Sequence, residues 1–235
     1  MPDHPPIPLH TNSRTMWASH RATGSNSVLV TIAELGEIAE AYALVLEVVA
    51  SLANRSTDLF VKQCPDAARR EAILCGYIVG LTLVEHAILS GYSAQAAALV
   101  RQELEAIAAL EELAKGVRKD GKTPNICHVP SIPGRVYGDL SRLAHFSDTP
   151  ALREIALLKG GIPECPKPAE VWLLSPQHVP NTTKQMFALH THLLLHFEEH
   201  QAMHYIELHG TLKDEQQTVA INRALSLLRE ADVLE

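Results

Sequence analysis

The sequence has few cysteines, and none is placed for a disulfide framework or a zinc knuckle. Its four cysteines, Cys64, Cys75, Cys127 and Cys165, are far apart and never form a C-x-x-C pair. Small secreted domains are dense in cysteine, and structural zinc sites need closely spaced pairs. The pattern therefore favours a reduced, intracellular protein.

The sequence also lacks a dense run of lysine and arginine. Its formal net charge is −7, from 20 Lys and Arg against 27 Asp and Glu. Proteins that hold nucleic acid by general electrostatics have the opposite balance. Such an interaction is not expected here, although a local RNA site stays open.

Neither a signal peptide nor a membrane span is expected. The first 26 residues lack the basic-then-apolar order of a signal peptide and hold Pro2, Pro5, Pro6 and Pro8 among polar residues. The most apolar run, Ile73 to Leu89, is short for a span and contains Glu85 and His86. We expect a cytoplasmic protein without membrane contact, with a disordered tail over residues 1–26 and one domain over residues 27–235.

Aromatic residues are scarce as well, at 5% against 46% hydrophobic residues overall, and the chain is rich in Ala, Leu and Glu. This composition favours helix over sheet. The fold class predicted is an all-α bundle of about six or seven helices, with long up-down-up helices at its start and a Pro-rich loop over residues 161–180. The ranges expected to be helical are 28–60, 65–90, 93–116, 135–146, 149–160, 181–210 and 213–234.

The helix over residues 93–116 is apolar on most sides, which predicts a central position. The remaining arc holds Arg101 and Glu105, one turn apart. One interpretation is an ordinary intrahelical ion pair. The other is that a buried arginine needs partners, so the pair organises a polar cluster between helices.

Residues 116–123 read GVRKDGKT and match every specified position of the phosphate-loop pattern. That motif needs a strand before the loop and a helix after it. Here a helical segment precedes the loop, and Pro124 follows it. We interpret the match as a helix cap and a basic, solvated turn.

The helix over residues 181–210 contains His192, His196, His200 and His204 at four-residue steps. His196 to His200 also fits the zinc-protease pattern H-x-x-E-H, with Glu199 between the two histidines. Such a protease needs a further carboxylate ligand on a later helix, and about 25 residues remain after Gly210. Interior or surface histidines are the simpler interpretation. No cofactor is expected, and a divalent metal at His196, Glu199 and His200 is the alternative.

Tyr137, Ser141 and His145 recur at four-residue steps on the short helix expected over residues 135–146, so their side chains can form a polar strip. One interpretation is the satisfied edge of a core. A Ser–His nucleophile pair is conceivable, but no third group or oxyanion site supports it, so no catalytic residue is assigned.

Two stretches, Leu99-Val-Arg-Gln-Glu-Leu-Glu105 and Tyr137-Gly-Asp-Leu-Ser-Arg-Leu-Ala-His145, resemble a family of uncharacterised bacterial all-helical proteins. That family looks related to the HEPN superfamily, whose active members are dimeric ribonucleases and toxins. The resemblance implies a homodimer and a helical bundle in which Arg101, Glu105, Tyr137, Ser141 and His145 converge on one polar cluster.

The HEPN catalytic signature is Arg, four to six residues, then His. In this chain only Arg14 and His20 have that spacing, and both fall in the expected tail. Arg142 and His145 are too close together. The leading hypothesis is therefore a non-catalytic HEPN-like module that binds a partner or ligand, in bacterial stress response or phage defence. The alternatives are a divergent ribonuclease or toxin and a metal-dependent activity at the His-rich helix.

Overall fold

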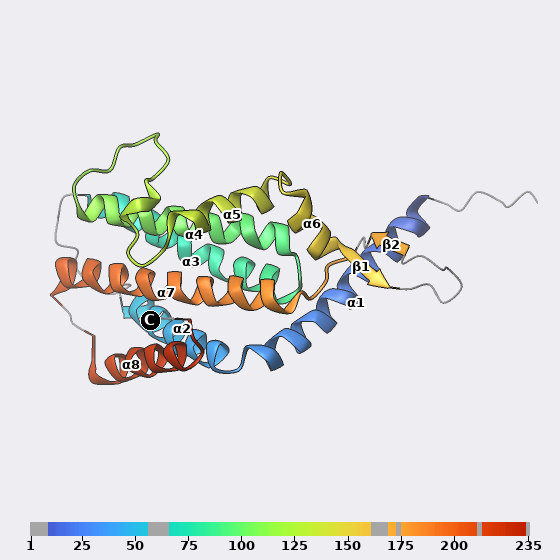
Figure 1. The fold of residues 1–235 in the computed structure, drawn as a ribbon. Helices are drawn as coiled ribbons and strands as arrows, with labels where there is room; N and C mark the ends of the chain where they lie inside the picture. The colour runs from blue at the N-terminus through green and yellow to red at the C-terminus, as the bar shows by residue number, and fades with distance from the viewer. Residues whose placement is uncertain (1–8, 56–65, 161–168, 173–174, 211–212, 234–235) are drawn as a thin grey trace, which may run out of the picture.

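The computed structural model describes residues 9–55, 66–160, 169–172, 175–210 and 213–233. The chain is built almost entirely of helices (Figure 1), which confirms the all-α fold class. The elements in chain order are α1 (Leu9–Leu35), α2 (Glu37–Arg55), α3 (Ala67–Leu89), α4 (Ser93–Ala114), a 3-10 turn η2 (Ile126–His128), α5 (Gly134–Ala144), α6 (Thr149–Ala156), β1 (Leu157–Gly160), β2 (Ala169–Trp172), α7 (Pro180–His209) and α8 (Glu215–Glu230).

The long helix α7 runs through the middle of the bundle (Figure 1). It contacts α3 and α4 on one side and α2 on the other, and α8 packs on α2. The expected up-down-up order is only partly right, because α2 packs chiefly on α7 and α8 while α3 and α4 are direct neighbours. The α7 helix, which comes much later in the chain, takes the place beside α2 that the sequence suggested for α3.

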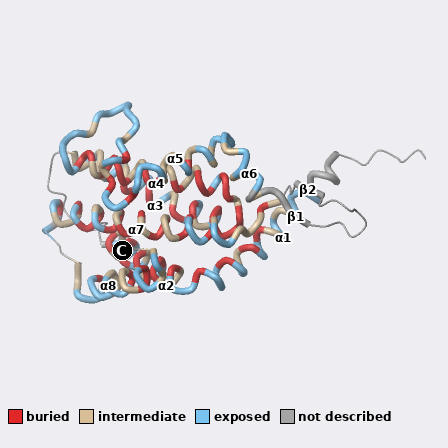
Figure 2. The backbone as a smooth tube through the Cα atoms, viewed as in Figure 1, coloured by how far each residue is buried: buried red, intermediate tan, exposed pale blue. Residues whose placement is uncertain are grey.

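The core lies where α3, α4 and α7 meet, and its buried backbone segments follow these helices in Figure 2. Leu104, Ile107, Leu193 and Phe197 are fully buried. The Tyr77 ring stacks on Phe197, with ring centroids 4.2 Å apart. Burial of such side chains stabilises the fold by roughly 1.5–3 kcal/mol each.

Residues 9–26 differ from the expectation of a disordered tail, because they form the first part of α1. The prolines end at Pro8, and none follows within α1 to stop a helix. The α1 helix begins beyond the bundle and then runs against α7 and α3 (Figure 1). Residues 1–8 lie outside the described residues.

Two further boundaries differ from the predictions. Gly36 adopts φ +48° and divides the helix expected over residues 28–60 into α1 and α2. The helix expected to end near Gly160 ends at Ala156, and β1 pairs antiparallel with β2, with Leu157 opposite Trp172. Val171 and Trp172 are residue types that favour extended pairing. The structure therefore contains a short hairpin where essentially no sheet was expected.

The turn between α3 and α4 positions the two helices that carry most of the polar groups discussed below. Gly91 has φ +79°, and the Tyr92 N–H donates to the Ala87 carbonyl at 2.9 Å. A Cβ atom added to Gly91 would lie 2.4 Å from the Gln177 carbonyl oxygen. Only glycine therefore fits this turn, which is held against the segment that leads into α7.

Candidate functional site

The five residues predicted to converge lie together where α5 packs along α4. We call Arg101, Glu105, Tyr137, Ser141 and His145 the α4–α5 cluster. Arg101 and Glu105 come from α4, Tyr137 and Ser141 come from α5, and His145 is the residue at the C-terminal cap of α5.

Arg101 is the centre of the cluster. Its Nη1 lies 2.8 Å from His145 Nε2, and its Nε lies 3.6 Å from Glu105 Oε1. Its guanidinium carbon lies 5.9 Å from the centroid of the Tyr137 ring, within reach of a cation–π interaction. The Arg101 side chain is 21% exposed, so it is partly rather than fully buried, and solvent can reach the cluster.

Tyr137 links α5 to Glu105, the acid of the Arg101–Glu105 ion pair. Its hydroxyl donates a hydrogen bond of 2.8 Å to Glu105 Oε1. The pKa of Tyr137 is raised, first because of this bond to a carboxylate and then because the phenol is partly buried. The phenol therefore stays protonated and acts as a donor.

The Arg101–His145 hydrogen bond defines the roles of the two imidazole nitrogens. An arginine N–H can only donate, so His145 Nε2 is the acceptor and the ring proton lies on Nδ1. In this arrangement Nε2 is engaged by Arg101, and Nδ1 can donate to another group.

Two polar atoms of the cluster are buried and have no hydrogen-bond partner among the described residues: Arg101 Nε and Ser141 Oγ. Unpaired buried polar atoms are uncommon in folded proteins and call for an explanation. Together with His145 Nδ1, they leave the cluster with donors that a bound acceptor could satisfy.

The structure does not gather the residues of the metal alternative into one site. His196 Nδ1 lies 3.7 Å from Glu199 Oε2, whereas His200 Nε2 lies 3.3 Å from Glu111 of α4. Across the described part of the chain, no group of three or more His, Cys, Asp or Glu side chains could hold a metal ion.

The rest of the histidine ladder is spread around α7. The rings of His192 and His196 stack with centroids 5.0 Å apart. The pKa of His192 is lowered to about 4, first by burial and then by the charge of His196. His204 is buried and lies 2.9 Å from Glu71. His192 and His196 therefore contact each other, whereas His204 contacts α3.

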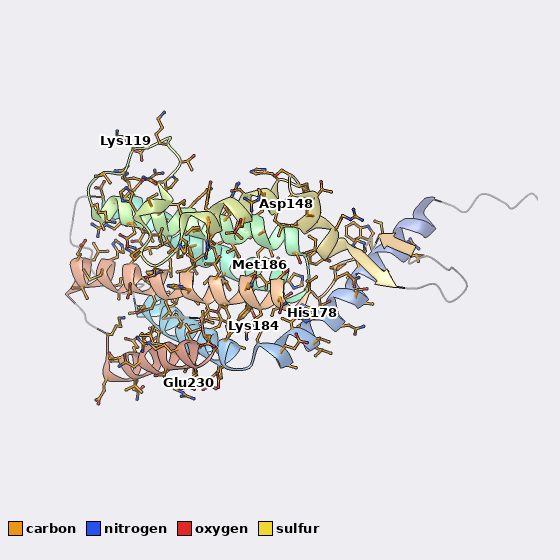
Figure 3. The ribbon with its side chains drawn as sticks, in the orientation of Figure 1. Lys119, Asp148, His178, Lys184, Met186 and Glu230 are labelled. Atoms are coloured by element: carbon orange, nitrogen blue, oxygen red, sulfur yellow. The ribbon has the colours of Figure 1, made fainter. Side chains whose placement is uncertain are left out.

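The segment that matches the phosphate-loop pattern follows α4 directly and uses its arginine internally. Arg118 Nη1 donates to Glu112 Oε2 at 3.1 Å and to the Lys122 carbonyl at 2.9 Å. Lys119 points outward from the loop in Figure 3. This geometry is that of a helix cap and a surface turn.

Sequence reasoning missed a buried pair that joins α4 to α7. Glu103 Oε2 lies 2.8 Å from His190 Nδ1, and the pair is nearly inaccessible to solvent. Burial raises the pKa of Glu103, and the hydrogen bond to His190 acts in the opposite direction. The available signal was an acid and an imidazole on the apolar sides of two predicted helices, but nothing in the sequence pairs them.

No protein-family model, no curated protein and no solved structure matches this chain. The function is therefore argued from the geometry of the α4–α5 cluster.

Proposed function

We propose that the protein is a non-catalytic, HEPN-like helical module that binds a partner or ligand at the α4–α5 cluster. The observation that carries this proposal is the 2.8 Å hydrogen bond from Arg101 to His145 Nε2. A general base must present a free basic nitrogen to the proton that it removes. In this cluster that nitrogen is occupied by a cationic donor.

The unused donors favour binding of a hydrogen-bond acceptor. Among the described residues, Arg101 Nε and Ser141 Oγ form no hydrogen bond, and Glu105 faces Arg101 Nε only at ion-pair distance, 3.6 Å. A phosphate, a carboxylate or a carbonyl group of a partner fits this arrangement. The resemblance to HEPN proteins adds a homodimer, the bacterial cytoplasm and a role in stress response or phage defence to the proposal.

The first experiment separates binding from ribonuclease activity. The purified full chain is incubated with a fluorescein-labelled single-stranded RNA, and the products are resolved on a denaturing gel. We expect no cleavage by the wild type and none by His145→Ala. Cleavage that His145→Ala abolishes would establish the ribonuclease alternative and end this proposal.

The second experiment tests binding directly. The Nε–H resonance of Arg101 is followed by NMR during titration with inorganic phosphate, the simplest acceptor. We expect a saturable shift at Arg101 and none at the exposed Arg223, which serves as an internal control. Tyr137→Phe keeps the ring beneath the guanidinium and should preserve binding, whereas His145→Ala should weaken it. A flat titration at Arg101 contradicts an acceptor-binding site.

A further inference from the structure

A cavity of about 370 Å³ lies between α3 and α4, on the side of α4 next to the α4–α5 cluster. It exists because Gly76 and Gly80 leave space on α3: a Cβ atom added to either would meet nothing within 4 Å. Its volume falls in the range of small-molecule sites. Its walls are largely apolar and include Ile73, Val84, Leu99, Ala106 and Ala109.

The cavity also has two buried polar residues in its lining, Tyr77 and Glu103, each 5% exposed. One Glu103 oxygen is bound to His190. The Tyr77 hydroxyl lies close enough to Glu103 to counteract part of the rise that burial causes in the pKa of its carboxyl group, but neither Glu103 Oε1 nor this hydroxyl has a hydrogen-bond partner of good geometry among the described residues. A carboxylate oxygen can only accept, so Glu103 Oε1 calls for a donor.

The charges around the cavity favour a cation. Glu103 and Glu105 both line it, and Arg118 is the one lysine or arginine among the lining residues. The Arg118 guanidinium is already paired with Glu112 at 3.1 Å. Glu105 is already paired with Arg101 and accepts the Tyr137 hydroxyl. The cavity therefore combines apolar walls with one carboxylate, Glu103, whose ion-pair partner among the described residues is the His190 imidazole rather than a lysine or arginine.

We propose that the α3–α4 cavity binds a small primary amine with an apolar body, whose ammonium group donates hydrogen bonds to Glu103 Oε1 and the Tyr77 hydroxyl. The apolar body lies over Gly76 and Gly80, between Ile73 and Leu99. This inference goes beyond the proposed function, because it uses different donors and acceptors and shares only Glu105 with the α4–α5 cluster.

The test compares three probes of one length: n-hexylamine, 1-hexanol and hexanoate, each titrated into the full chain and followed by calorimetry and NMR. We expect n-hexylamine to bind at least tenfold more tightly than 1-hexanol, and hexanoate not to bind. Both the ammonium charge and its donors contribute to this order.

Two variants locate the site. Gly80→Leu fills the cavity without a clash at Cβ and should abolish n-hexylamine binding. Glu103→Gln should reduce the preference for the amine over the alcohol to less than threefold. Val79→Leu is the matched control, because Val79 lies on the same helix, is 80% exposed and does not line the cavity.

Equal affinity for n-hexylamine and 1-hexanol would overturn the proposal, as would n-hexylamine binding that survives Gly80→Leu. The proposal is also rejected if none of the three probes binds. This holds even if the reason is that a second copy of the chain fills the cavity. If Glu103→Gln fails to fold, Gly80→Leu still decides. The phosphate titration at Arg101 is independent, so failure here is distinguishable from failure of the proposed function.

Discussion

Helices α3 and α4 are neighbours of similar length, yet hydropathy ranks them in the wrong order for burial. An 18-residue window of α3 has a mean hydropathy of 1.9, so by length and composition alone α3 could cross a membrane, but only 39% of that window is buried. Val79 and Leu83 of α3 are 80% and 56% exposed. On α4, by contrast, Val100, Leu104 and Ile107 are completely buried.

The difference lies in the neighbours of each helix. The α4 helix places an acid toward three of the segments around it: Glu103 toward His190 of α7, Glu105 toward Tyr137 of α5, and Glu112 toward Arg118 of the following loop.

The polar partners of α3 lie toward its ends, where Glu71 contacts His204 and Glu85 accepts from Tyr42. Between them, the side chains of Val79 and Leu83 are exposed. Both helices therefore have cross-helix polar partners. The central helix is distinguished by its neighbours, because α4 packs against α3, α5, α7 and η2, whereas α3 packs mainly against α4 and α7.

The strongest test of this comparison is truncation of one leucine on each helix. Leu104→Ala should lower the free energy of unfolding by about 2–5 kcal/mol, because it leaves a cavity in a closed core. Leu83→Ala should change it by less than about 0.5 kcal/mol. Urea denaturation of both variants measures the difference. A large loss for Leu83→Ala would show that the outer side of α3 is covered in solution.

The turn between the two helices should be the next most sensitive position. Gly91→Ala places a Cβ atom 2.4 Å from the Gln177 carbonyl oxygen at a residue with φ +79°. We expect a loss of roughly 2–3 kcal/mol from backbone strain and displacement of the Gln177 segment. Thermal melting measures it, with Gly116→Ala as the control, since Gly116 also has positive φ but nothing within 4 Å of an added Cβ.

The acid at the end of α4 should make stability depend on pH. The pKa of Glu112 is lowered, first because its carboxylate accepts the Asn125 N–H at 2.7 Å. The contribution is therefore present above the ordinary glutamate pKa of 4.5 and is lost as the pH falls through the lower folded value.

Glu112→Gln should cost about 1–2 kcal/mol at pH 7 and progressively less in acid. Denaturation curves from pH 7 to pH 3 measure the change, and Glu47→Gln at an exposed position of α2 is the control. An equal cost of Glu112→Gln at both ends of the range contradicts the charged role.

The smallest expected change in the free energy of unfolding is an increase rather than a decrease. Gly76 and Gly80 are helical, and each has open space where a Cβ atom would lie. Gly76→Ala and Gly80→Ala should each raise the free energy of unfolding by about 0.5–1 kcal/mol, because alanine loses less conformational entropy in a helix. Thermal melting of each variant measures the gain. A loss instead would reveal a close partner on this side of α3.

Much of the helical fold could be predicted from local signals. Pro180 lies in the first turn of α7, and Gly210 follows its end with φ 67°, so both boundaries follow from residue type. The helix boundary at Gly36 was harder to predict, because a single glycine within an apolar-periodic segment does not by itself indicate that the helix ends. The packing of α7 between α2 and the α3–α4 pair depends on contacts between residues far apart in sequence, which periodicity does not encode.

The composition of the candidate site could be predicted to a similar extent. Four-residue steps place Arg101 beside Glu105 and align Tyr137 with Ser141 and His145. The Arg101–His145 bond depends in addition on α5 lying along α4, and the sequence reached it only through a family resemblance. The Glu103–His190 pair had no local signal of its own. The functional role of the α4–α5 cluster stays a prediction.

The bond between Glu103 and His190 spans 87 positions in the chain. During translation, α2, α3 and α4 emerge long before α7. Glu103 on α4 therefore cannot pair with His190 until α7 has been synthesised. We therefore expect the nascent chain to expose an unfinished apolar surface until the last third has left the ribosome. Chains truncated before α7 should accordingly aggregate or engage chaperones rather than accumulate as a smaller folded domain.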